Sequence, residues 1–120
     1  LFQHEYSANF LFTLWKRVRK YGACCTGLTQ NVDDLLQSHT ARTMLANSEF
    51  LVMLNQAATD RAELARLLNI SDNQLSYITN VDFGRGLIKC GSAIVPFMDN
   101  FPKNRLYRLM TTKLSETNAA

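Results

Sequence analysis

An uncharged run of small and apolar residues, 23–28, is the feature that most constrains the fold. It lies between Gly22 and the polar step Thr29-Gln30, and it follows a helical pattern over residues 3–21. A short apolar run bounded by turn residues is typical of a strand covered on both faces, as in parallel sheets. We therefore predict an α/β fold with a partial parallel sheet, in which Thr29-Gln30 ends a buried strand.

The predicted first helix is amphipathic and strongly basic near its C-terminal end. Gly22 is a suitable residue to end it, because glycine accepts the left-handed backbone conformation found there. Cations in the last turn complement the helix dipole, which is the simpler account of the cluster. The alternative is that an arginine reaches into a neighbouring subunit and stabilises the charge of phosphoryl transfer. The cluster consists of Lys16, Arg17, Arg19 and Lys20.

The remaining chain continues the alternation of helix and strand patterns. Short helices are expected after Asn31 or Asp33 and after Ser38, followed by a second buried strand at 50–54. Two further helices are predicted from Asp60-x-x-Glu63 and Ser71-x-x-Gln74, because both spacings match a capping box.

The C-terminal third has a β pattern. Residues 87–90 and 93–97 form a predicted hairpin joined by Gly91-Ser92, and Pro96 directs its second strand to a sheet edge. A last strand is predicted at 106–110, and 115–120 is predicted to be a disordered tail.

Composition sets broad limits. The 120 residues suffice for one domain or part of one, and 47% hydrophobic with 19% charged residues is typical of a globular fold. No run approaches the roughly 18 apolar residues of a membrane-spanning helix. A net charge of +3 is weak evidence for a polyanionic partner, and three cysteines predict reduced, buried thiols. The apolar start at Leu1 indicates a segment of a longer chain.

Thr29-Gln30 is the first candidate site. Ligands of open α/β sheets bind beyond the carboxyl ends of the strands, where this pair is predicted to lie. A glutamine amide donates and accepts hydrogen bonds at once, so it can orient a water molecule or sense a γ-phosphate. The simpler interpretation is a polar turn chosen for solubility.

Residues 60–97 present a rival interpretation, a winged helix-turn-helix module that binds DNA. Against it, the candidate recognition helix over 71–79 contains no lysine or arginine and carries Asp72, whereas phosphate contact and guanine recognition favour basic residues. Gly84-Arg85-Gly86 is interpreted as the turn that enters the hairpin. The GxxxxGK[ST] signature of a phosphate-binding loop is absent, and no metal site or hydrolytic triad is predicted.

Longer blocks of the sequence resemble the large cytoplasmic ATPases of type IV secretion and conjugative transfer. The version found in conjugative transposons of Gram-positive bacteria is most similar. The resemblance covers nearly the whole chain and is carried by residues 26–36, 40–50, 54–56, 67–71, 76–80, 86–89 and 109–113.

The resemblance implies the C-terminal part of a RecA-like P-loop NTPase domain, over residues 1–114, with its Walker A and Walker B motifs upstream. It assigns Thr29 and Gln30 to the nucleotide site, with Gln30 as the γ-phosphate sensor. It assigns Arg19 as the arginine that acts in a neighbouring subunit, with Arg17 as second choice. ATP and Mg²⁺ are the implied cofactors of the longer protein, and the isolated chain is expected to be inactive.

The same resemblance implies partners and location. The partners are the N-terminal half of the same protein, neighbouring subunits of a homo-oligomer and other type IV secretion subunits, with DNA as a further candidate. The expected location is the cytoplasm, peripheral to the inner face of the cell membrane. A non-catalytic domain that docks other secretion subunits is the remaining alternative.

Overall fold

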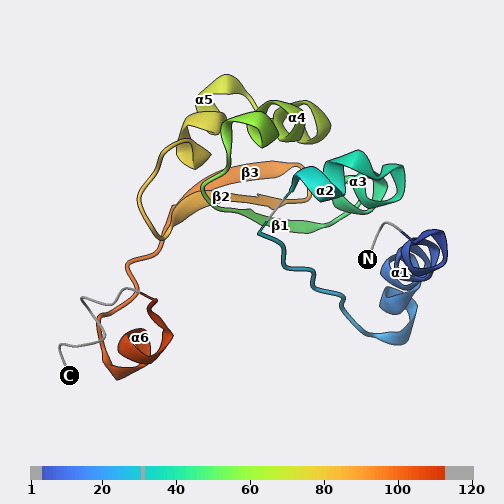
Figure 1. The fold of residues 1–120 in the computed structure, drawn as a ribbon, viewed down its shortest axis with the longest axis horizontal. Helices are drawn as coiled ribbons and strands as arrows, with labels where there is room; N and C mark the ends of the chain where they lie inside the picture. Colours follow the sequence, from blue (N-terminus) through green and yellow to red (C-terminus); the bar gives the residue numbers. More distant parts are fainter. Residues whose placement is uncertain (1–3, 31, 113–120) are drawn as a thin grey trace.

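A computed structural model describes residues 4–30 and 32–112 of the chain (Figure 1). Helices cover a small sheet, and a short C-terminal helix stands apart from both. In chain order the elements are α1 (Glu5–Arg17), the 3-10 helix η1 (Val18–Tyr21), α2 (Asp33–Gln37), α3 (His39–Ala46), β1 (Phe50–Met53), α4 (Ala58–Leu68), α5 (Asp72–Leu75), the 3-10 helix η2 (Ser76–Ile78), β2 (Arg85–Cys90), β3 (Ala93–Met98) and α6 (Arg105–Met110).

The sheet has three antiparallel strands in the order β1-β2-β3. Gly91 has a φ of 57° and begins the turn between β2 and β3, so the predicted hairpin is confirmed. Pro96 lies opposite Leu87 on β3, an edge strand, as expected for a residue without an N–H group. The predicted parallel sheet is wrong for the described residues, whose strand pairs are all antiparallel.

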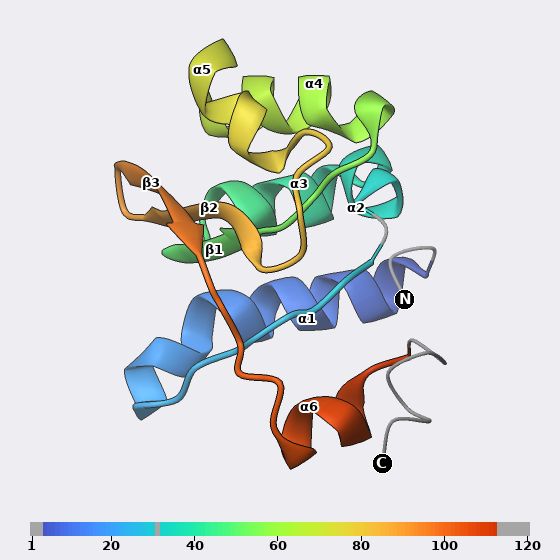
Figure 2. The ribbon, with the colours of Figure 1, turned by 90° about the vertical axis from the view of Figure 1, so that its left-hand side faces the viewer.

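Residues 23–28 do not form the predicted buried strand. The segment 22–30 is extended and almost entirely exposed, with Leu28 94% exposed. Cys24, predicted to be buried, is exposed as well. Figures 1 and 2 show the segment running beside α1 and in the same direction as β1. A strand covered on both faces needs neighbouring strands, and no strand of the described residues pairs with this one.

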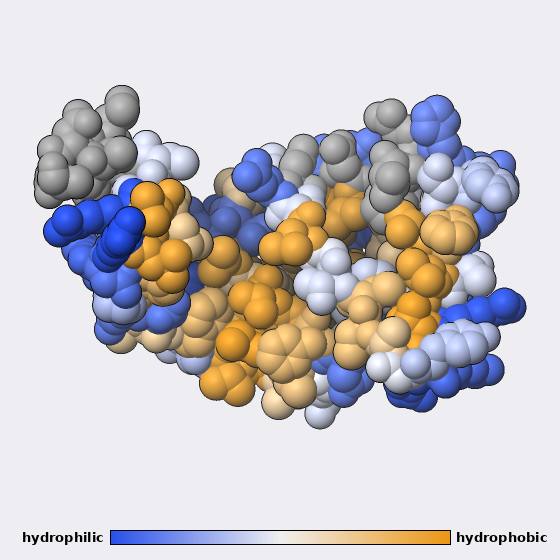
Figure 3. Space-filling view, turned by 90° about the horizontal axis from the view of Figure 1, so that it is seen from below, coloured by the Kyte–Doolittle hydropathy of each residue, from blue (hydrophilic) through white to orange (hydrophobic). Residues whose placement is uncertain are grey.

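The hydrophobic core lies between one face of the sheet and the helices above it. Ile78 and Leu87 are completely buried there, and α4 contributes two leucines. The opposite face of the sheet is apolar but open, as seen from below in Figure 3. Phe50, Val52 and Val95 on that face are 61%, 55% and 57% exposed. The core cluster consists of Leu36, Met53, Leu64, Leu68, Ile70, Ile78 and Leu87.

Helix ends follow their sequence signals in most places. Gly22 ends η1 with a φ of 68°, and its N–H donates to the carbonyl oxygen of Arg19. Ser38 caps α3, and Ser71 forms the predicted capping box with Gln74. The capping role predicted for Asp60 is wrong. Helix α4 already begins at Ala58, and the Asp60 carboxylate accepts a hydrogen bond from Thr59 Oγ1 at 3.0 Å.

The caps proposed for α2 differ from the structure. Asp33 is the first residue of the helix, and Val32 occupies the capping position without a side-chain hydrogen bond. Asn31, the other proposed cap, lies outside the described residues, as does the predicted tail at 115–120.

Residues 106–110 belong to helix α6, so the predicted last strand is wrong. Asn104 caps this helix by accepting a hydrogen bond from the N–H of Tyr107 at 3.0 Å. Leu106, Leu109 and Met110 follow helical three- and four-residue spacing, which the strand prediction overlooked. They are all exposed, so the helix has an uncovered apolar stripe.

The described residues contain no recognition helix of the kind that the helix-turn-helix interpretation requires. Helix α5 is a single turn, and η2 continues it for only three residues. Ile78, at the end of η2, is completely buried in the core cluster that includes Leu87 of β2. An element this short, with its end held in the core, cannot enter a major groove as a recognition helix does.

Candidate functional site

Thr29 and Gln30 lie at the end of the extended segment 22–30, directly before α2. Both residues are exposed, and the backbone bends at Gln30. Segment 22–30 and β1 run in the same direction (Figures 1 and 2), so their carboxyl ends point to the same end of the molecule. Gln30 therefore follows an extended segment, but this segment pairs with no strand of the described residues, so the predicted strand end does not form there.

Arg17 and Arg19 lie at the other end of the same segment. Arg17 is the last residue of α1, Arg19 belongs to η1, and both are exposed. Segment 22–30 separates them from Gln30 without turning back (Figures 1 and 2). At about 3.3 Å a residue, its eight steps can span up to roughly 26 Å. The structure therefore keeps Arg17 and Arg19 away from Gln30 of the same chain.

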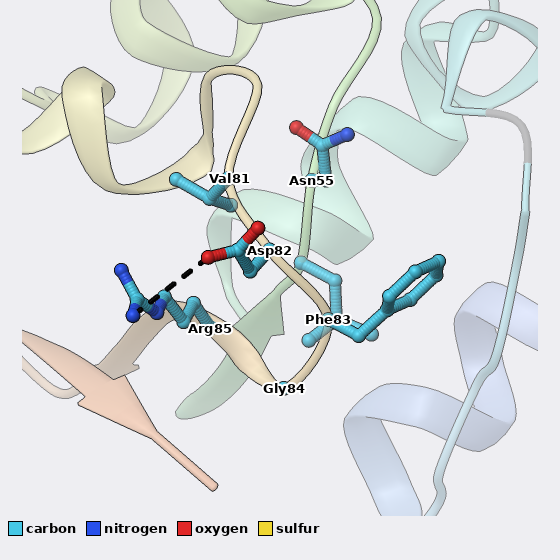
Figure 4. Close-up of a pocket in the computed structure, with 7 residues that line it drawn as sticks. Asn55, Val81, Asp82, Phe83, Gly84 and Arg85 are labelled. Atoms are coloured by element: carbon cyan, nitrogen blue, oxygen red, sulfur yellow. Dashed lines mark ion pairs between the residues drawn. The ribbon is translucent and has the colours of Figure 1, made fainter.

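A pocket of about 170 Å³ lies where β1 ends and β2 begins (Figure 4). Leu54 and Asn55 line it from the residues that follow β1, and the turn 81–85 closes its other side. Phe83 and Arg85 leave this turn on opposite sides, with the Phe83 ring on the side where the chain passes towards α2. The pocket therefore lies beyond the carboxyl end of β1, the end of the molecule towards which segment 22–30 also runs.

The turn 81–85 is held by close backbone packing. Gly84 has a φ of 77°, and its carbonyl oxygen accepts a hydrogen bond from the N–H of Asp99 at 2.7 Å. A Cβ atom at Gly84 would meet the carbonyl oxygen of Asp99, and one at Gly86 would meet that of Met53. Both glycines are therefore required by geometry, and they fix the backbone from which Phe83 and Arg85 project.

Ion pairs contribute little to this region. Arg85 Nη2 and Asp82 Oδ2 are 3.8 Å apart, and their side chains are 50% and 84% exposed. Solvent screens such a pair, which is worth at most about 1 kcal/mol. This pair therefore does not hold Arg85 and Asp82 firmly in one arrangement.

Asn55 and Phe83 line this pocket but were not among the candidate residues predicted from the sequence. Asn55 carries the same signal as Gln30, a polar amide just beyond an apolar strand, but was treated only as the end of that strand. No sequence signal marks Phe83 as a surface residue, because phenylalanine side chains are usually buried. In the structure this side chain is 88% exposed.

Within the described residues, no group of three or more His, Cys, Asp or Glu side chains is placed to hold a metal ion. The same residues include no helix whose length and apolar character would let it cross a membrane.

Comparison with solved structures relates this combination of helices and small antiparallel sheet to the VirB4-like proteins. The chain is similar to VirB4 of Thermoanaerobacter pseudethanolicus, with a TM-score of 0.74 and 26% sequence identity. The match covers 81% of this chain and 27% of the VirB4 chain, so this chain spans about a quarter of that protein. No family model matches the sequence, and no curated protein matches it.

The likeness supports the resemblance found in the sequence at the level of a VirB4-like protein. It combines a fold match with 26% identity, so it concerns the sequence as well as the backbone.

Proposed function

We propose that this chain is the C-terminal part of the motor domain of a VirB4-like ATPase that powers type IV secretion or conjugative transfer. The likeness to VirB4 over 81% of the chain is the observation that carries the proposal. The assignment to the conjugative transposon version of these ATPases is more specific than this likeness, and it rests on the matching sequence blocks alone.

Gln30 is the residue to which we assign γ-phosphate sensing, with Thr29 beside it. Its exposed position beyond an extended segment leaves the amide accessible to a ligand at this end of the molecule. An amide that donates to a phosphate oxygen and accepts from a water molecule would align that water for attack on the γ-phosphate. Thr29 would contribute a hydroxyl to the same site.

The remaining parts of such a site would come from the longer protein. A phosphate-binding loop and a Mg²⁺ ligand are needed for hydrolysis, and the sequence contains no phosphate-loop signature. The exposed segment 22–30 and the open edge of β1 run in the same direction, which fits a sheet completed by strands from that protein. ATP and Mg²⁺ are its proposed cofactors, and this chain alone is proposed to be inactive.

We also propose partners and a cellular location for the longer protein. Neighbouring copies of the same protein and other type IV secretion subunits would surround the motor domain, at the cytoplasmic face of the membrane. DNA would be cargo of the whole system rather than a ligand of α5, because that helix is a single turn without basic residues.

The test is the Gln30→Ala variant of the longer protein. We expect ATP binding to persist, because the phosphate-binding loop is untouched, while turnover falls by roughly 10²-fold, as for other lost transition-state contacts. Nucleotide binding and steady-state hydrolysis would be measured on the same preparation. Unchanged turnover would remove the sensor role, and a wild-type protein without ATPase activity would leave the docking-domain alternative.

A further inference from the structure

The pocket between β1 and β2 has a size and lining residues that suit a single flat ring. Its volume of about 170 Å³ is below the roughly 300 Å³ at which ligand pockets usually begin, so a whole nucleotide does not fit. Phe83, an exposed aromatic residue, lines it from the turn 81–85, and Asn55 lines it from the residues that follow β1 (Figure 4).

These two side chains match the two ways in which proteins recognise a base. An aromatic side chain stacks on the face of any base, because every base has a π-face. An asparagine amide donates and accepts at adjacent positions, which complements the N7 acceptor and the N6 amino group of adenine. Guanine presents two acceptors at the corresponding edge, so the amide distinguishes the two purines.

The backbone prepares the site before any ligand binds. Gly84 and Gly86 hold the turn against Asp99 and Met53, so Phe83 projects from a fixed position. Asn55 follows β1 directly, and β1 is paired along its length with β2. The pocket lies beyond the carboxyl end of β1, the end of the molecule towards which segment 22–30 also runs.

We propose that Phe83 and Asn55 form the base subsite of the nucleotide site, with Phe83 stacking on adenine and Asn55 reading its edge. The subsite deepens the proposed function and rests on it. Phe83 supplies affinity for any purine nucleotide, whereas Asn55 supplies the preference for ATP over GTP.

The experiment compares Phe83→Ala and Asn55→Ala in the longer protein, with ATP, GTP and inorganic tripolyphosphate as probes. We expect Phe83→Ala to weaken ATP and GTP binding about tenfold, the loss of one stacked base. Tripolyphosphate binding should not change, because it has no base. Asn55→Ala should reduce the ratio of ATP to GTP affinity and leave tripolyphosphate binding unchanged.

Two controls separate stacking from misfolding. Phe83→Tyr keeps an aromatic face and should keep near wild-type ATP affinity. Tyr6→Ala removes an equally exposed aromatic residue from α1 and should have no effect on any probe. The inference is overturned if Phe83→Ala leaves ATP binding unchanged or weakens tripolyphosphate binding equally. A longer protein that hydrolyses ATP with Gln30 as sensor, yet is insensitive at Phe83 and Asn55, would reject this subsite alone.

Discussion

The backbone at Gly84 shows how a single residue controls the pocket. Its positive φ and its contact with the Asp99 carbonyl exclude any side chain. Gly27 is a useful contrast, because a Cβ there would meet only the Trp15 ring, at an ordinary 3.6 Å. The two glycines therefore differ in what the fold requires of them.

We expect Gly84→Ala to destabilise the chain by about 1–3 kcal/mol, the cost of holding a residue in a disfavoured backbone region. Gly27→Ala should change the free energy of unfolding by no more than about 0.5 kcal/mol. Chemical denaturation of both variants beside the wild type measures the difference. Equal stability of the two variants would contradict the packing described for the turn.

Individual residues were predictable where the signal is local. The spacing of Ser71 and Gln74 predicts a capping box, and Gly22 predicts a helix end. Both features depend only on residues within one helical turn. The turn that carries Phe83 is held by a hydrogen bond between Gly84 and Asp99, which is distant in sequence, so a local pattern does not reveal this turn. Gln30 was proposed from its place after a predicted strand, and the same reasoning applied to Asn55 would have pointed to the pocket.

Among the elements, segment 22–30 is the one whose length matters for function. It places Arg19 and Gln30 at opposite ends of an extended stretch. If both serve ATP hydrolysis, they must serve different sites, so Arg19 would act in the neighbouring subunit. The helix-dipole account of the basic cluster instead makes Arg19 and Lys20 equivalent, because both lie in the last turn.

We expect Arg19→Ala in the longer protein to lower turnover by roughly 10³-fold or more, as for other arginine fingers. Lys20→Ala is the matched control and should keep near wild-type turnover. Mixing Arg19→Ala subunits with Gln30→Ala subunits should restore hydrolysis, because some interfaces then hold both intact residues. No recovery on mixing would place Arg19 in the same site as Gln30, and inactivity of Arg17→Ala alone would transfer the role to Arg17.

The type of an element was predictable where the residues that pair with it and bury it belong to the described part of this chain. The hairpin of β2 and β3 has both partners and its turn residues in one stretch, and it was predicted correctly. Residues 23–28 have the composition of a buried strand but lack partners among the described residues, so composition alone was misleading. Residues 106–110 are mostly apolar, which favoured a strand, but their spacing is helical and Asn104 caps the helix.

The whole molecule is more open than a compact domain of its length. Its radius of gyration is 16.7 Å, against about 14 Å expected for 120 residues. Part of the difference is visible in Figure 1, where α6 stands away from the sheet. The open sheet face with Phe50, Val52 and Val95 adds apolar surface that a solvated protein rarely leaves uncovered.

We expect the isolated chain to self-associate through this face. Sedimentation or light scattering after size-exclusion chromatography should give a mass well above the 13.6 kDa monomer. A Val52→Lys, Val95→Lys double variant should shift the distribution towards monomer, because charges on that face oppose stacking. Tyr6→Lys on α1 is the control, and it adds one positive charge away from this face where the double variant adds two. A monomeric wild-type chain would show that this sheet face does not mediate self-association.

The straight path of segment 22–30 has a consequence for the order in which subunits act, if the chain belongs to the proposed motor domain. If Arg19 serves the neighbour's site, each subunit holds one end of this segment in its own nucleotide site and the other end next door. A displacement along the segment when phosphate leaves Gln30 would then reach Arg19 directly, with no other element needed to carry it. ATP hydrolysis at one site would then change the arrangement of Arg19 at the adjacent site. Neighbouring subunits would therefore hydrolyse ATP in sequence rather than independently.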